Sequence, residues 1–193
     1  MTRCTAIFVA LTGTALLLPP VVAQETNACT PLPATKLEGF ETNTDTVIIK
    51  ATAPVGSVQA HSGTVAVRCR EITDAGSGHR ESGVIIDITS GGPLEDSLLI
   101  DYDELDSLLD GLDYIAKLDW TVTPLPSFSA VYTTKGGFRA AAFGSRRTGN
   151  IEFSVRSMRV FRPPLLLSRD QLGQLRSLVE QGKAKLDSLR QPK

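Results

Sequence analysis

Apolar residues alternate with polar ones in short runs between residues 46 and 100. The clearest run is 64–72, where Val65, Val67 and Cys69 occupy every second position. A period of two is typical of a half-buried strand. Shorter runs of the same kind predict strands at 46–51, 84–88 and 97–100.

The apolar spacing changes between residues 102 and 118. Four leucines and an isoleucine, starting at Leu105, recur at i, i+3, i+4, i+7 and i+10, which places them on one stripe of a helix. Asp101 and Glu104 have the spacing of a capping box. Asp101 is therefore predicted to accept hydrogen bonds from the first free amides of this helix, with Glu104 reaching back.

Three further β-rich runs and a second helix follow. The runs 128–134, 138–143 and 151–160 are separated by glycine-bearing breaks, which favour antiparallel hairpins. Ser168 and Gln171 form a second capping box, and the apolar period then continues to Leu189. A closing helix is predicted over 168–189.

This order of elements predicts an α+β domain over residues 37–193. The expected architecture is an antiparallel sheet, or a partly open barrel, of about seven strands with one mid-chain helix and one C-terminal helix. By its strand count and closing helix, the alternative architecture is similar to a pleckstrin-homology-like barrel. Residues 24–36 are polar, contain prolines and show no period, and they predict an extended leader.

Residues 1–23 have the layout of a secretory signal peptide. Arg3 precedes an apolar run over 6–18, which is shorter than the roughly 20 residues that span a bilayer. The small residues Val21 and Ala23 predict cleavage after Ala23; the alternative is an uncleaved membrane anchor. The mature protein is expected to be periplasmic or secreted, and no membrane association is expected after cleavage.

Cleavage would remove Cys4 and leave Cys29 and Cys69. In an exported chain these two can form a disulfide, which would stabilise the fold by about 3–4 kcal/mol. The alternative is that Cys69 is only a small core residue. The cysteines and histidines lack Cys-x-x-Cys and His-x-x-x-His spacing, so neither a metal site nor a cofactor is predicted.

Charge is unevenly distributed along the chain. The 20 Lys and Arg against 21 Asp and Glu exclude a polyelectrolyte tail, and 41% apolar residues exclude a polytopic membrane protein. However, residues 24–120 contain 17 acidic and 6 basic side chains, whereas residues 121–193 contain 4 and 13. Either the two halves neutralise each other, or the basic half presents a surface to a partner.

The candidate binding residues lie in that basic half. Arg146 and Arg147 occupy a glycine-bearing break where a hairpin tip is expected, and Lys135 and Arg139 lie on the preceding hairpin. They predict binding of an acidic protein or an anionic ligand. Nucleic acid is not expected, because no aromatic residue lies between the basic ones and because the chain carries an export signal.

No catalytic residue is assigned. There is no Gly-x-Ser-x-Gly motif, His61 and His79 lie in loop contexts, and Leu105 breaks the ligand spacing that a calcium loop would need in the acidic run 101–106. The leading hypothesis is a non-enzymatic binding module. Its rivals are a hydrolase with a site of dispersed carboxylates, and a structural or assembly factor that uses the run 165–167.

Overall fold

The computed structural model of this 193-residue chain describes residues 34–90 and 95–190. The predicted signal peptide and Cys29 lie outside the described residues. The first half contains α1 (Lys36–Glu41), β1 (Ile48–Ala60), β2 (Gly63–Asp74), β3 (Arg80–Ser90), β4 (Glu95–Asp101), a 3₁₀ turn (Tyr102–Glu104) and α2 (Leu105–Lys117). The second half contains β5 (Ser127–Thr133), β6 (Phe138–Ser145), β7 (Asn150–Ser157), β8 (Leu165–Leu167) and α3 (Arg169–Arg190). The predicted α+β class, with a mid-chain and a C-terminal helix, is confirmed.

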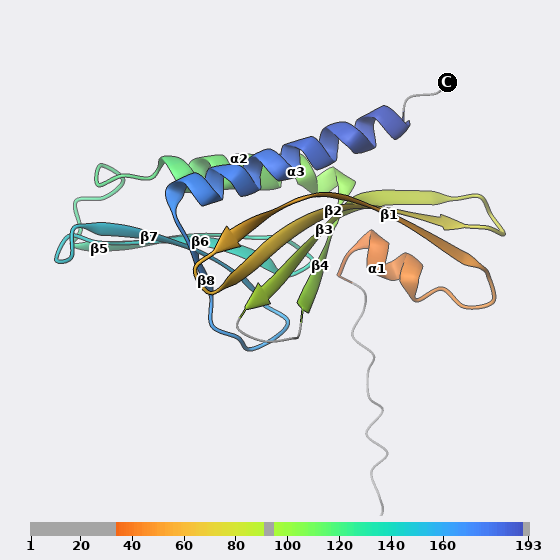
Figure 1. Ribbon diagram of the computed structural model, residues 1–193, viewed down its shortest axis with the longest axis horizontal. Helices are drawn as coiled ribbons and strands as arrows, with labels where there is room; N and C mark the ends of the chain where they lie inside the picture. Colours follow the sequence, from red (N-terminus) through yellow and green to blue (C-terminus); the bar gives the residue numbers. More distant parts are fainter. Residues whose placement is uncertain (1–33, 91–94, 191–193) are drawn as a thin grey trace, which may run out of the picture. The chain divides into compact units, whose positions relative to one another are not determined.

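The strands form two antiparallel sheets of four strands each, in the order of the sequence. Strands β1 to β4 make sheet A, and strands β5 to β8 make sheet B (Figure 1). The similarity to a pleckstrin-homology-like barrel is wrong, because the described strands form two open sheets. The additional strand is β8, where Leu165 and Leu167 are buried and Leu166 faces outward.

Each long helix packs on the sheet of the other half. Helix α2 follows sheet A in sequence but contacts β5 and β6, whereas α3 follows sheet B but contacts β1, β2 and β3. The two helices also lie against each other. One apolar core joins both sheets and both helices, with members such as Val67, Leu112, Phe138 and Val179. The halves therefore depend on each other for burial of their apolar faces.

The opposite face of sheet A carries a smaller core under α1. Leu37 packs there with Ile72, Ile85 and Leu99. The Asp101 carboxylate fastens this short helix, because it accepts hydrogen bonds from the backbone amides of Lys36 at 2.7 Å and Leu37 at 3.1 Å. Thr35 caps the helix locally, because its hydroxyl accepts a hydrogen bond from the Glu38 amide at 3.1 Å. Helix α1 was not predicted, since the polar, proline-containing leader shows no helical period.

The predicted capping box at Asp101 and Glu104 is therefore wrong. Asp101 caps α1, and Glu104 accepts a hydrogen bond from the Lys135 amide at 2.7 Å. Both carboxylates are buried, and backbone donors from other segments replace the local amides as their partners. Within the described residues, Glu104 is bonded in this way through Oε1 only, and its buried Oε2 has no partner. The second box is confirmed: the Ser168 amide donates to Gln171 at 2.7 Å, and the Gln171 amide donates to the Ser168 hydroxyl at 3.1 Å.

Part of the charge asymmetry is neutralised between the helices. Arg176 of α3 lies 3.0 Å from Asp113 of α2, and Lys183 lies 3.4 Å from Asp106. Tyr102, just before α2, donates to Asp187 of α3, and this hydrogen bond lowers the pKa of the Asp187 carboxyl. The two helices thus neutralise each other in part, alongside the ion pairs that α3 forms within itself.

Cys69 is a buried free thiol among the described residues. Its Sγ lies 3.4 Å from the Gly182 carbonyl of α3, and burial raises the pKa of the thiol. Cys69 is therefore part of the apolar core. The Cys29–Cys69 disulfide stays a prediction, because Cys29 lies outside the described residues.

The turn between β5 and β6 packs tightly against strand β4 of sheet A at Gly136, and this close contact allows a test of the fold. A Cβ on Gly136 would lie 1.9 Å from the Leu99 carbonyl oxygen of β4, too close for any side chain. We expect Gly136→Ala to lower the free energy of unfolding by about 2 kcal/mol or more. Urea denaturation measures this change.

Gly173→Ala is the matched control. Gly173 lies within α3, and a Cβ there would meet no atom within 4 Å. Because alanine favours a helix interior over glycine, this variant is expected to gain about 0.5–1 kcal/mol. Equal effects of the two substitutions would contradict the close contact at Gly136.

Candidate functional site

The four basic residues predicted from the sequence do not form one site. Lys135 lies in the turn before β6, and Arg146 and Arg147 lie in the turn after it, at opposite ends of that strand. The side chains of Lys135 and Arg147 are exposed. Arg139, within β6, is the member of the four that lines a hollow.

Arg146 fastens a loop instead of presenting its charge at a hairpin tip. Its guanidinium donates to the carbonyl oxygens of Trp120 at 2.7 Å, Thr123 at 3.0 Å and Leu125 at 3.3 Å. It also lies over the Trp120 ring, 5.6 Å from the centroid. The segment between α2 and β5 supplies all of these contacts, so Arg146 has a structural role, and its part in binding stays a prediction.

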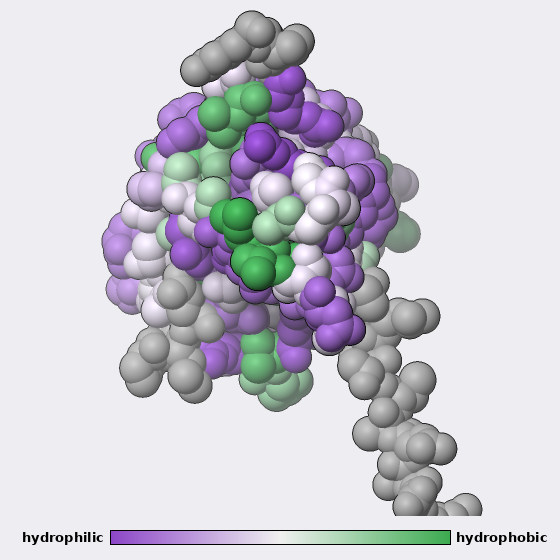
Figure 2. Space-filling view, turned by 90° about the vertical axis from the view of Figure 1, so that its right-hand side faces the viewer, coloured by the Kyte–Doolittle hydropathy of each residue, from purple (hydrophilic) through white to green (hydrophobic). Residues whose placement is uncertain are grey.

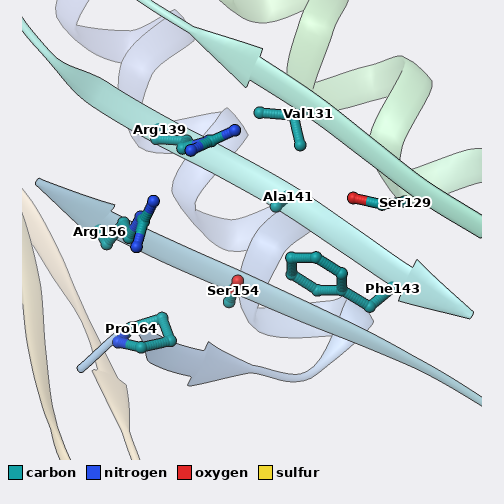
Figure 3. Close-up of a pocket in the computed structure, with 8 residues that line it drawn as sticks. All are labelled: Ser129, Val131, Arg139, Ala141, Phe143, Ser154, Arg156 and Pro164. Carbon is teal, nitrogen blue, oxygen red and sulfur yellow. The ribbon is translucent and has the colours of Figure 1, made fainter. Parts of the chain in front are cut away.

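A hollow of about 270 Å³ lies on the outer face of sheet B, the face turned away from the core. Figure 3 shows its lining, with Arg139 and Arg156 on neighbouring strands and the Phe143 ring beside Ser154. The lining residues come from three strands and the segment before β8: Ser129, Val131, Arg139, Ala141, Phe143, Ser154, Arg156 and Pro164.

Small side chains create the floor of the hollow. Ala141 and Ser154 are direct cross-strand partners, and both residues are buried. Their larger neighbours Val131 and Phe143 rise beside them and are partly exposed. Within the described residues the Ser154 hydroxyl makes no hydrogen bond, so it is available as a donor and acceptor at the floor.

Two arginines stand directly opposite each other at one end of the hollow. Arg139 of β6 and Arg156 of β7 are register partners. Like charges placed in this way destabilise a sheet. Among the described residues neither guanidinium has a carboxylate partner; Arg139 donates only to the Met158 sulfur, at 3.5 Å. The hollow therefore has an uncompensated positive end.

The rest of sheet B does little to offset this charge. Glu152 is the one acidic residue in its four strands, and it lies opposite Phe143, at the other end of the hollow. In the loop between β7 and β8, Arg159 forms an ion pair with Glu38 of α1. The charge of Arg159 is therefore neutralised within the fold. Arg139 and Arg156 are the charged side chains in the lining of the hollow.

The sequence predictions missed Arg156. Its alternation with Ser154 along β7 shows that both share a face, but only the register between β6 and β7 places Arg156 beside Arg139. A hairpin register derived from the break 144–150 could have found this pair.

Other features of the described surface point less clearly to a ligand. A second hollow, of about 320 Å³ near the end of α3, mixes Arg70 and Arg80 with Glu71. Figure 2, which looks onto the right-hand side of Figure 1, shows apolar side chains in small separate patches on a polar face. Scattered patches of this kind are ordinary for a protein surface.

The residues considered for chemistry lie apart. His79 stacks on Phe40, with ring centroids 5.0 Å apart, and lies 3.4 Å from Glu81, whereas His61 lies in the exposed turn between β1 and β2. The hollow on sheet B has no carboxylate in its lining. In the described part of the chain, no three metal-ligating side chains converge.

Comparisons of the chain with models of protein families, with curated proteins and with solved structures find no match. Across residues 34–90 and 95–190, no helix combines the length and the apolar character needed to cross a membrane.

The structural role of Arg146 can be separated from that of its neighbour. Arg146→Ala removes donors to three carbonyl groups, and we expect it to lower the free energy of unfolding by about 1–2 kcal/mol. Arg147→Ala, in the same turn, should change it by less than about 0.5 kcal/mol. Thermal and urea unfolding of both variants measures the difference, and equal stabilities would show that the carbonyl contacts contribute nothing.

Proposed function

We propose that this protein is a non-enzymatic binding module that takes an anionic partner in the hollow on the outer face of sheet B. The carrying observation is the Arg139–Arg156 pair, which faces solvent in a hollow without a carboxylate to balance it. The export signal predicted from residues 1–23 and the Cys29–Cys69 bond belong to the same proposal, which assigns the module to the cell envelope or the extracellular space.

The two guanidinium groups favour an anion with several oxygen atoms. Each presents a planar fork of donors that matches a carboxylate or a phosphate. An anion held between them also relieves their mutual repulsion, so binding gains the electrostatic energy that the free protein lacks. The site is therefore more favourable for an anion than either arginine alone.

The remaining lining favours an apolar body attached to that anion. Val131, Ala141 and Phe143 offer aliphatic and aromatic surface beside the charged end, and the Ser154 hydroxyl adds one polar contact at the floor. A hollow of about 270 Å³ suits a small group, such as an aromatic ring or a branched side chain.

Phenyl phosphate is a suitable probe, since it joins a divalent anion to an aromatic ring. We expect it to shift the amide resonances of the β6 and β7 residues that line the hollow. Arg139→Gln combined with Arg156→Gln should weaken this binding at least tenfold, because both charged contacts are lost. Titration followed by ¹H–¹⁵N NMR measures the affinity and locates the site.

The control removes two positive charges outside the hollow, by Arg147→Gln with Lys185→Gln, both exposed residues. This control variant should bind phenyl phosphate with the same affinity as the unaltered protein. The site variant should unfold at no lower urea concentration than the unaltered protein, since a repulsive pair is removed. Binding that survives the loss of Arg139 and Arg156, or shifts confined to another face, would refute the proposal.

A further inference from the structure

Strand β5 is a free edge of sheet B. It pairs with β6 on one side, and no described strand pairs with its other side. Two backbone hydrogen bonds show which residues of β5 face β6: the Thr134 amide donates to Phe138 at 2.9 Å, and the Arg146 amide donates to Pro126 at 2.8 Å. Thr134 and Pro126 therefore direct their backbone groups toward β6. In an antiparallel pair, successive residues of a strand alternately direct their backbone groups toward the partner strand and away from it. The backbone groups of Ser129, Val131 and Thr133 therefore point away from β6.

The other three sheet edges are guarded against strand addition. Strand β1 contains Pro54 and a register shift between Pro54 and Gly56, β8 has only three residues, and the backbone at Gly136 lies against the Leu99 carbonyl of β4. Proline, bulges, short length and covering segments are the usual means of blocking an edge.

Strand β5 has none of these blocking features. Its sequence, SFSAVYT, contains no proline and no charged residue, and its pairing with β6 is free of bulges. A seven-residue strand whose alternate amides point outward and are not blocked is a template for another strand. This edge borders the hollow, because Ser129 and Val131 of β5 are part of the lining.

We propose that the anionic partner is an extended acidic polypeptide segment that adds to β5 as a fifth strand of sheet B. This inference rests on the proposed function and names its partner class. Backbone hydrogen bonds to the outward groups of β5 supply affinity. An acidic side chain of the segment supplies the anion, and Arg139, the nearer of the two arginines, recognises it.

The register of the sheet supports this arrangement. Arg139 lies directly opposite Thr133. A residue of the added strand opposite Thr133 would be two strand spacings from Arg139, about 9.6 Å, which an arginine and a glutamate span together. Two residues along, the same face of the segment would meet Val131, which favours an apolar side chain. The preferred pattern is acidic and apolar at alternate residues on one face.

A second copy of this chain fits the edge less well. A copy pairing through its own β5 would bring a strand without carboxylates to the arginines, and would set two basic hollows beside each other. Charge complementarity favours an acidic segment over self-association.

The probe is a capped heptapeptide, Thr-Glu-Thr-Val-Thr-Glu-Thr, which places Glu, Val and Glu on one face in either strand direction. Replacing both Glu by Gln should weaken binding at least tenfold, and so should N-methylation of alternate peptide amides. Hydrogen exchange gives the decisive readout: the peptide should slow exchange at the amides of Ser129, Val131 and Thr133, whereas those of Ala130 and Tyr132 already face β6.

Variants of β5 separate strand addition from anion binding. Thr133→Pro removes one outward amide at a residue outside the lining of the hollow, and should weaken peptide binding at least tenfold while phenyl phosphate still binds. Thr133→Val keeps the amide and should bind the peptide normally. Urea unfolding verifies that both variants are folded.

Each contrary result has a distinct meaning. If phenyl phosphate binds but the peptide leaves the three outward amides unprotected, strand addition is refuted and anion binding stands. If neither probe responds to Arg139→Gln with Arg156→Gln, both proposals fail. Protection of the same amides without peptide, together with a dimer in sedimentation, would assign the edge to a second copy and overturn the inference.

Discussion

A single apolar layer between the two long helices and the two sheets governs the rest of this structure. Leu112 of α2 and Val179 of α3 belong to it, together with inward-facing residues of both sheets. An open sheet with one uncovered apolar face is not stable in water, and each sheet here obtains its cover from the other half. Ion pairs such as Asp113–Arg176 are partly exposed and contribute little.

Local periodicity predicted most of the elements. The period of two in β2, the leucine stripe of α2 and the Ser168 capping box are properties of neighbouring residues, and burial in the folded chain agrees with them. The division into two sheets and the exchange of helices depend on contacts between distant segments. Asp101 and Glu104 illustrate the limit: the spacing fits a local cap, but once both carboxylates are buried they bond amides from α1 and from the turn before β6.

The residues of the candidate site could be predicted from the sequence only in part, because the site too depends on contacts between distant segments. Arg139 could be predicted from the basic character of its hairpin, but its partner Arg156 depends on the β6–β7 register, where a slip of one residue would turn it to the other face. Arg146 has the composition of a binding residue, yet three carbonyl groups from the segment before β5 occupy its guanidinium. The hollow exists because the side chains of Ala141 and Ser154 are small. No local sequence motif indicates a site of this kind.

The exchange of helices also sets an order in time. Sheet A is synthesised first, but its cover, α3, is the last element of the fold. Its apolar face cannot be covered by α3 before the residues of that helix have emerged. The contacts that cover it join segments far apart in sequence, and contacts of this kind form slowly. Until then the first half of the chain exposes apolar surface that the folded protein buries, and this makes the growing chain prone to association.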